Sequence, residues 1–269
     1  MPRILLHHEA AESAAASKEF ELDYETAKKV ARVLRMSEGE TFIGFDGRGK
    51  EWDCVIVSTQ GQGKRPYVRA VALSERAGQA PLPLYLCVAQ ALPKGEKIDF
   101  VLQKGTELGV AEFWPFEAGR SVTRLFIEED GERAGNRAAR WRKIVESASA
   151  QCGRADVPEV RAASDFATVA SEAVSAGRCF MLDEAKDAKP LREILEEEPL
   201  EHADGIEFAS DAPHIILLVG PEGGWTAEER DWAQRYGVES VSLGTRILRT
   251  ETAALVAASI LLWESGGLS

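Results

Sequence analysis

Two short segments late in the sequence combine glycine with charged side chains. The first is Gly220-Pro-Glu-Gly-Gly224, and the second is Leu243-Gly-Thr-Arg-Ile-Leu-Arg249. Glycine lets the main chain approach a ligand closely, so backbone groups can bind it directly. Glu222 and Arg249 add a carboxylate and a guanidinium group, which could exchange a proton or stabilise a developing negative charge. The two segments therefore indicate a binding pocket with groups for acid–base or charge-stabilising chemistry.

The surrounding sequence indicates which elements hold these two segments. An apolar run from His214 predicts a buried strand, and Thr226-Ala-Glu-Glu229 has the residues of a capping box that starts a helix. The second segment lies between a predicted strand at residues 238–244 and a predicted helix at residues 251–263. We expect both loops at the carboxyl ends of adjacent parallel strands, where open α/β sheets bind ligands.

Common nucleotide-binding motifs are absent from the sequence. It contains neither G-x-G-x-x-G nor G-x-x-x-x-G-K-[ST], which disfavours a Rossmann dinucleotide site and a P-loop. A nucleotide-dependent enzyme of another reaction class, such as a dehydrogenase, is therefore disfavoured.

Three further motifs precede these loops. They are Ala91-Leu-Pro-Lys-Gly95, Gln103-Lys-Gly-Thr-Glu-Leu-Gly-Val110, and Gln151-Cys-Gly-Arg154 with Val157-Pro158. In this order, and together with the two loops, they resemble the SPOUT methyltransferases, knotted S-adenosylmethionine enzymes that modify RNA. Within that superfamily the sequence resembles the ribosomal RNA small subunit methyltransferase E family, which methylates N3 of a uridine near the 3′ end of 16S rRNA. One departure is Gly105, where that family commonly has alanine.

The resemblance implies two domains joined by a linker. Residues 1–76 would form a PUA-like small β-barrel that holds RNA, residues 77–83 the linker, and residues 84–269 the methyltransferase domain. The residue pattern alone predicts only a small barrel at the start, with two strands around an Asp46-Gly47 turn and a helix near residues 24–35. The later alternation of strands and helices predicts an α/β fold with a parallel sheet. The resemblance adds a SPOUT-type trefoil knot at the C-terminal end.

The resemblance also implies that S-adenosyl-L-methionine is the cofactor. A third loop, at residues 181–185, would join the two glycine-containing loops around it. Backbone groups would bind the adenine and ribose while leucine and isoleucine side chains pack against the ring. A valine at Gly220 or Gly223 is expected to abolish binding without unfolding the protein. The expected cofactor-binding residues are Leu182, Glu184, Gly220, Pro221, Glu222, Gly223, Leu243, Gly244, Ile247, Leu248 and Thr252.

Methylation of uracil N3 requires removal of a proton and stabilisation of the negative charge that spreads to O2 and O4. Arg249 is the first candidate for the stabilising cation, and Arg246 is the second. A salt bridge from Arg249 to Glu251 or Glu222 is the alternative. Glu222 could act as the general base, or its carboxylate could accept backbone N–H groups and fix the loop. Both interpretations of Glu222 are open.

The charge distribution bears on an RNA partner. The net charge of −12 does not favour RNA, but phosphate binding depends on local charge. Residues 133–161 contain seven basic and three acidic side chains, which predicts a basic patch. Lys104, Arg120 and Arg154 are the expected RNA contacts, with Arg120 at the end of a strand that begins at Glu112. The implied partner is 16S rRNA within the small ribosomal subunit, and neither DNA nor a membrane is expected.

Several bulk features bear on compartment, metals and assembly. No apolar run reaches membrane-spanning length and the start lacks a signal-peptide pattern, so a cytoplasmic protein is expected. The four cysteines are widely spaced without a C-x-x-C pair, so no metal site is predicted. SPOUT relatives form two-fold dimers, and a homodimer is expected here. The final helix supports it with more apolar surface than one core face needs, through Leu255, Val256, Ile260, Leu261 and Trp263.

Two other functions fit parts of the pattern. One is a non-catalytic RNA-binding or ribosome-assembly protein that keeps the barrel and the cleft. The other is a SPOUT methyltransferase acting on a different RNA, such as a tRNA 2′-hydroxyl. The glycine loops disfavour the first, and the order of the middle motifs together with the N-terminal barrel disfavours the second.

Overall fold

The computed structural model describes residues 1–60, 65–77, 82–122, 131–185, 187–200 and 212–268, with the side chains of 131–133 left out. The chain divides into two compact units. The first comprises residues 1–79 and 146–157, and the second comprises residues 80–145 and 158–269. The sequence did not predict that residues 146–157 group with the N-terminal unit. Most of the predicted linker, residues 78–81, lies outside the described part of the chain.

The first unit is built on a five-stranded sheet with strand order β1-β3-β4-β5-β2. Strands β1 and β3 are parallel, and the other neighbours are antiparallel. The predicted turn at Asp46 connects β3 to β4, where the Asp46 carboxylate accepts the backbone N–H groups of Arg48 and Lys50. The strands are β1 (Arg3–Leu5), β2 (Glu19–Glu21), β3 (Thr41–Phe45), β4 (Glu51–Gln60) and β5 (Tyr67–Arg76).

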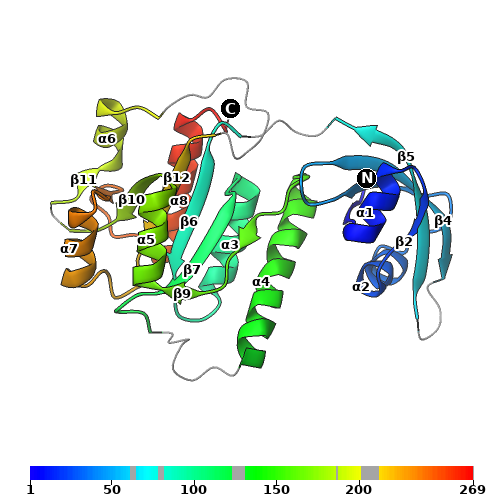
Figure 1. Cartoon of the computed structure of the whole chain (residues 1–269), viewed down its shortest axis with the longest axis horizontal. Coiled ribbons are helices and arrows are strands. Elements are labelled where there is room, and N and C mark those ends of the chain that lie inside the picture. The colour runs from blue at the N-terminus through cyan, green and yellow to red at the C-terminus, as the bar shows by residue number, and fades with distance from the viewer. Residues whose placement is uncertain (61–64, 78–81, 123–130, 186, 201–211, 269) are drawn as a thin grey trace. The chain divides into compact units, whose positions relative to one another are not determined.

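Two helical segments pack on this sheet (Figure 1). Helix α1 (His8–Ala15) was not predicted from the sequence, whereas α2 (Tyr24–Lys28) and the π-helix that continues it (Lys29–Val33) occupy the predicted helix. The Asp23 carboxylate caps α2 by accepting the backbone N–H groups of Glu25 and Thr26.

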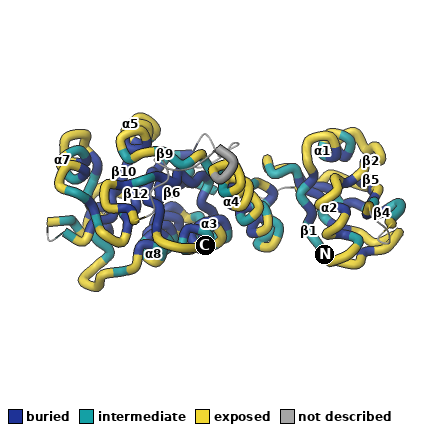
Figure 2. Tube along the Cα trace, turned by 90° about the horizontal axis from the view of Figure 1, so that it is seen from below, coloured by how far each residue is buried: buried dark blue, intermediate teal, exposed yellow. Residues whose placement is uncertain are grey.

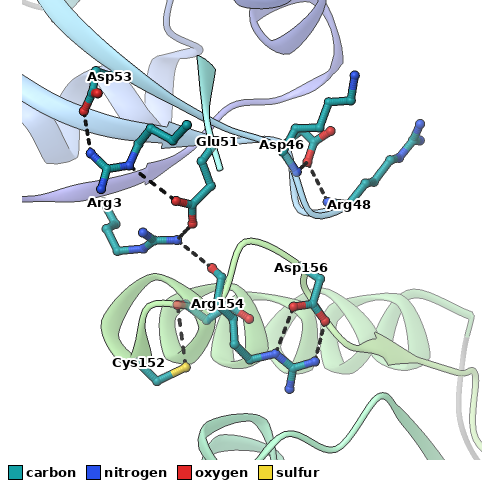
Figure 3. Close-up of polar contacts among 11 residues, drawn as sticks. Arg3, Asp46, Arg48, Glu51, Asp53, Cys152, Arg154 and Asp156 are labelled. Atoms are coloured by element: carbon teal, nitrogen blue, oxygen red, sulfur yellow. Dashed lines mark hydrogen bonds and ion pairs between the residues drawn. The ribbon is translucent and has the colours of Figure 1, made fainter. Parts of the chain in front are cut away.

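The segment after helix α4 (Gly131–Cys152) is attached to the β3–β4 connection of the same unit. Asp156 pairs with Gly47 in an isolated bridge, and the Val157 N–H donates to the Gly47 carbonyl at 3.0 Å. The Arg3 side chain binds both the Glu51 carboxylate and the backbone carbonyl of Arg154, as Figure 3 shows. These contacts explain why residues 146–157 belong to the first unit.

The second unit contains an eight-stranded sheet with the order β11-β13-β10-β12-β6-β7-β8, and β9 pairs with β7. Every pairing in it is parallel, which confirms the predicted α/β fold class. The trefoil knot implied by the resemblance stays a prediction. The strands are β6 (Tyr85–Ala91), β7 (Glu112–Glu117), β8 (Glu159–Val160), β9 (Ser164–Asp165), β10 (Arg178–Leu182), β11 (Lys189–Pro190), β12 (His214–Val219) and β13 (Glu239–Ser242).

The order of the central strands corrects one expectation. Strands β12 and β13 are not adjacent, because β10 lies between them. Leu182, the last residue of β10, pairs with Val219 of β12 and with Val241 of β13. The three strands therefore end at the same level, and their loops meet even though two of them are not neighbours.

Helices cover both faces of this sheet. Helix α8 packs on β6 and β12 and against α3, while α5 and α7 contribute to a second core cluster around Trp225. Figure 2 shows β6, β10 and β12 as almost continuously buried. Among the described residues, no helix combines the length and apolar character that a membrane span requires. The helices of this unit besides α4 are α3 (Lys97–Leu108), α5 (Phe166–Ala176), α6 (Leu191–Glu197), α7 (Ala227–Arg235) and α8 (Thr250–Glu264).

Candidate functional site

A cavity of about 400 Å³ lies where β10, β12 and β13 end. Its wall consists of the loops that follow these strands, the first turns of α8 and one side chain from α3. Parallel strands bring their carboxyl ends to one edge, which is where ligands bind in open α/β sheets. The lining residues are Lys97, Leu182, Asp183, Glu184, Val219, Gly220, Pro221, Glu222, Gly224, Trp225, Val241, Ser242, Leu243, Gly244, Arg246, Ile247, Leu248, Arg249, Thr250 and Ala253.

The cavity wall includes most of the residues expected to bind cofactor, but Gly223 and Thr252 are not part of it. Gly223 instead packs against Arg120, whose backbone oxygen would lie 3.1 Å from a Cβ at position 223. Thr252 is exposed on the first turn of α8. Ile247 lines the cavity but its side chain is 80% exposed, so it lies at the rim.

Gly220 is small for a reason that the sequence did not reveal. A Cβ at this position would lie 3.0 Å from Cε2 of Trp225, a side chain that is 1% exposed. The Trp225 indole N–H donates to the Leu182 carbonyl at 2.7 Å, which connects the β12 loop to the end of β10. A valine at Gly220 would therefore press on a buried ring as well as fill the cavity, so we now expect it to destabilise the fold as well as to abolish binding.

Asp183 and Arg230 form a second connection between these loops. Arg230 on α7 donates from Nε and Nη2 to the two Asp183 oxygens, at 2.6 and 3.0 Å. Its Nη1 group also donates to the Trp225 carbonyl at 3.0 Å. The hydrogen bond to Asp183 and its negative charge raise the pKa of Arg230. The paired guanidinium therefore compensates a buried carboxylate in the cavity wall.

Thr250, the first residue of α8, connects the third loop to the sheet. Its hydroxyl donates to the Gly220 carbonyl at 2.6 Å and accepts a hydrogen bond from Nε2 of Gln90 at 2.9 Å. Gln90 is the penultimate residue of β6, is only 2% exposed, and also donates to the Ala91 carbonyl. Its own Oε1 has no hydrogen-bond partner in the described part of the chain. The sequence analysis missed both side chains.

Glu222 is held by two groups near the start of α3. Its Oε1 accepts the Lys94 N–H at 3.1 Å and the Lys97 ammonium at 2.8 Å. Lys97 also lies 3.6 Å from Oε2 of Glu251. Burial acts to raise the pKa of Glu222, but the hydrogen bonds from Lys97 and the backbone, with the Lys97 charge, lower it overall. A carboxylate so stabilised in its ionised form is a weak proton acceptor, which favours the loop-fixing interpretation.

Arg249 occupies the N-cap position of α8 and lines the cavity. Within the described residues its side chain makes no ion pair, and neither Glu251 nor Glu222 binds it. The alternative of a salt bridge to one of these carboxylates is therefore wrong. Arg246 also lines the cavity and is exposed. Because each helix N-terminus carries partial positive charge, the first turn of α8 adds to the field that an anion would meet beside Arg249.

The expected RNA contacts differ in how available they are. Arg120 is exposed but follows β7 rather than ending it, since that strand stops at Glu117, and its Nη1 donates to the Gly223 carbonyl at 3.2 Å. Lys104 binds Glu107 on the same helix at 2.8 Å. The Arg154 side chain is 12% exposed and binds Asp156 (Figure 3).

The predicted basic patch is also partly neutralised. Arg140 pairs with Glu96 and Asp99, and Arg161 pairs with Glu112 and Glu172. Trp141 is buried, so it packs rather than presenting its ring. Among the described basic residues of 133–161, two are exposed and have no ion pair, namely Arg142 and Lys143.

Family models match both parts of the chain. The RNA methyltransferase domain matches residues 80–262, and the RNA methyltransferase PUA domain matches residues 30–63. The cavity lies within the first of these matches. These matches define the chain as a member of the RNA methyltransferases that carry a PUA domain.

Individual relatives narrow this class. The chain is 30% identical to the ribosomal RNA small subunit methyltransferase E of Bacillus subtilis over 91% of this chain and 90% of that protein. It is 33% identical to the Mycobacterium bovis protein of the same name, over 84% of this chain and 79% of the relative. The chain belongs to the ribosomal RNA small subunit methyltransferase E family.

Solved structures resemble the whole chain. The Neisseria gonorrhoeae ribosomal RNA small subunit methyltransferase E, bound to S-adenosyl methionine, has a TM-score of 0.78 and 30% identity, covering 97% of this chain and 96% of that one. A Legionella pneumophila protein in complex with the bound cofactor SAM has a TM-score of 0.81 and 32% identity, with the same coverage.

Proposed function

We propose that this protein transfers a methyl group from S-adenosyl-L-methionine to N3 of a uridine near the 3′ end of 16S rRNA. The observation that carries the proposal is the cavity at three parallel strand ends, whose wall contains Arg249, a guanidinium without an ion pair among the described residues. Membership of the family supports rRNA methylation, and the choice of N3 rests on the sequence resemblance.

The cavity suits the proposed cofactor. Its volume falls in the range of about 300–1,000 Å³ that is typical of small-molecule sites. Leu182, Leu243 and Leu248 offer apolar surface for an adenine ring, and the backbone at the three strand ends offers polar groups for its edge and for the ribose. Two similar structures contain S-adenosyl methionine.

The residues around the cavity would assist the reaction mainly by position and charge. S-adenosylmethionine supplies an electrophilic methyl group on a sulfonium centre. The uracil must lose its N3 proton, and the negative charge then spreads over O2 and O4. Arg249 would donate hydrogen bonds to one of these oxygens, aided by the N-terminus of α8. A preorganised cation of this kind favours the anion before methyl transfer.

We assign Glu222 to holding the loop rather than to proton transfer. Its carboxylate already binds Lys97 and the Lys94 N–H, and its lowered pKa makes it a poor base. On this proposal, Arg249 makes the uracil N3 more acidic, and the N3 proton passes to solvent or to an RNA group.

We further propose that the enzyme acts in the cytoplasm as a homodimer on rRNA of the small ribosomal subunit. Side chains of Val256 and Trp263 on α8 and of Phe100 on α3 are exposed apolar groups of the second unit, as a dimer interface there requires. Exposed cations that could bind phosphate include Arg120, Arg142 and Lys143. Lys104 and Arg154 would have to exchange their present carboxylate partners for phosphate.

Replacing Arg249 with alanine tests the proposed chemistry. The variant should bind S-adenosylmethionine with nearly unchanged affinity and methylate rRNA about 10²- to 10³-fold more slowly, the usual loss for one charge-stabilising donor. Single-turnover rates at saturating RNA, with calorimetry for the cofactor, separate the two effects. If the saturated rate holds while RNA affinity falls, Arg249 is a binding residue. Mass spectrometry of rRNA from cells lacking the protein identifies the methylated nucleotide, and methyl loss from a tRNA would favour the 2′-O alternative.

A further inference from the structure

Within the described residues Arg249 is unpaired, although one carboxylate lines the same cavity wall and another follows it closely in the chain. Glu251 is two positions along the chain from it, and Glu222 lines the same wall. A guanidinium group is well suited to bind either of them. In the described residues neither carboxylate does so, because both are engaged by one lysine.

That lysine occupies an unusual position for a cation. Lys97 is the first residue of α3, where the helix dipole disfavours positive charge. Its ammonium lies 2.8 Å from Oε1 of Glu222 and 3.6 Å from Oε2 of Glu251. Oε2 of Glu251 is buried and has no hydrogen-bond partner in the described part of the chain. The Lys97 ammonium is therefore the group that compensates the negative charge of Glu251. The placement is explained if the lysine serves these two carboxylates.

We propose that Lys97 is a positioning residue that occupies Glu222 and Glu251 and so keeps Arg249 available for the uracil anion. The inference rests on the proposed role of Arg249. Without the Lys97 charge, Glu222 and Glu251 would both lose their cation, while Arg249 lines the same wall as Glu222. Arg249 would then pair with one of them and leave the position from which it meets the substrate.

The first test removes only the charge of Lys97. Lys97→Met keeps the length of the side chain and should lower the methylation rate at saturating cofactor and RNA about five- to tenfold, since capture leaves only a fraction of Arg249 competent. Lys97→Arg retains both ion pairs and should keep the rate. Lys189→Met is the matched control, because Lys189 pairs with Glu197 outside the cavity wall and its loss should leave the rate unchanged.

The decisive test is a second substitution that restores activity. Neutralising a capturing carboxylate in the Lys97→Met background, by Glu222→Gln or by Glu251→Gln, should return the rate toward that of the unmodified enzyme. A lysine that merely stabilises the fold predicts the opposite, since each further loss of an ion pair would slow or destabilise the enzyme more. The proposal is overturned if Lys97→Met is as fast as the unmodified enzyme, or if neither double variant is faster than Lys97→Met.

The Arg249→Ala variant separates this inference from the proposed function. A normal saturated rate in Arg249→Ala would refute the role of Arg249 itself, whatever the lysine variants do. A slow Arg249→Ala enzyme combined with no recovery in either double variant would refute only the role of Lys97. As a further check, Arg249→Ala combined with Lys97→Met should be no slower than Arg249→Ala alone, because the lysine then has nothing to protect.

Discussion

Replacing Thr250 with valine removes one hydroxyl group at the start of α8 with little change in side-chain size. The hydroxyl joins three elements, because it donates to the Gly220 carbonyl at 2.6 Å and accepts from Gln90 Nε2 at 2.9 Å. Loss of the first bond costs about 1 kcal/mol, and the Gln90 N–H left unpaired in a buried site costs about 1–3 kcal/mol more. We therefore expect the free energy of unfolding to fall by about 2–4 kcal/mol.

Denaturant unfolding of a small set of variants tests this estimate. Thr250→Ser keeps the hydroxyl and should retain most of the stability. Ser259→Ala is the control on the same helix, since the Ser259 hydroxyl donates to the Leu255 carbonyl of its own helix. In a Gln90→Leu background the buried N–H is gone, so Thr250→Val should cost only about 1 kcal/mol. Equal costs of Thr250→Val in the two backgrounds would refute the hydrogen-bonded chain.

Three other perturbations follow from the site. Because folding lowers the pKa of Glu222, this carboxylate contributes stability above its ordinary pKa and loses that contribution as the pH falls. In unfolding experiments across pH, Glu222→Gln should therefore lose less stability on the acid side than the unmodified protein. Parallel pH profiles of the two proteins would argue against this. Gly220→Val should lower the melting temperature because its Cβ meets the Trp225 ring, and an unchanged melting temperature would contradict that packing. Light scattering at micromolar concentration should give a dimer mass that Trp263→Ser reduces, since Trp263 is 65% exposed; a monomer mass for the unmodified chain would count against the homodimer.

Local sequence patterns predicted the elements around the cavity well. Thr226 and Glu229 form the predicted capping box, with each side chain bonded to the other residue's backbone N–H. The apolar run from His214 is β12, and the predicted final helix is α8, which begins one residue earlier than expected. These features depend on residues a few positions apart, so their spacing is visible in the sequence.

The contacts that hold the loops were not predictable in this way. Gln90 and Thr250 are 160 positions apart, and the Lys97 and Glu222 positions differ by 125. Such pairs form only after the strand order is set, and periodicity contains no information on strand order. The same limitation explains the error about β12 and β13, whose separation by β10 requires knowledge of the whole sheet. It also explains the error about Arg120: β7 ends at Glu117, and just after it the Gly119 N–H donates to Glu229, 110 positions later.

These distant contacts have a common consequence for binding. The Leu182 carbonyl, the Gly220 carbonyl and the Glu222 carboxylate each accept a hydrogen bond from a side chain, namely from Trp225, Thr250 and Lys97. The three loops are therefore ordered by the protein itself, and a ligand entering the cavity need not supply the energy to order them. Preorganisation of this kind favours affinity because the loops lose their conformational entropy during folding and not during ligand binding. It also leaves Arg249, which like Arg246 has no ion pair in the described part of the chain, able to respond to the substrate beside these fixed loops.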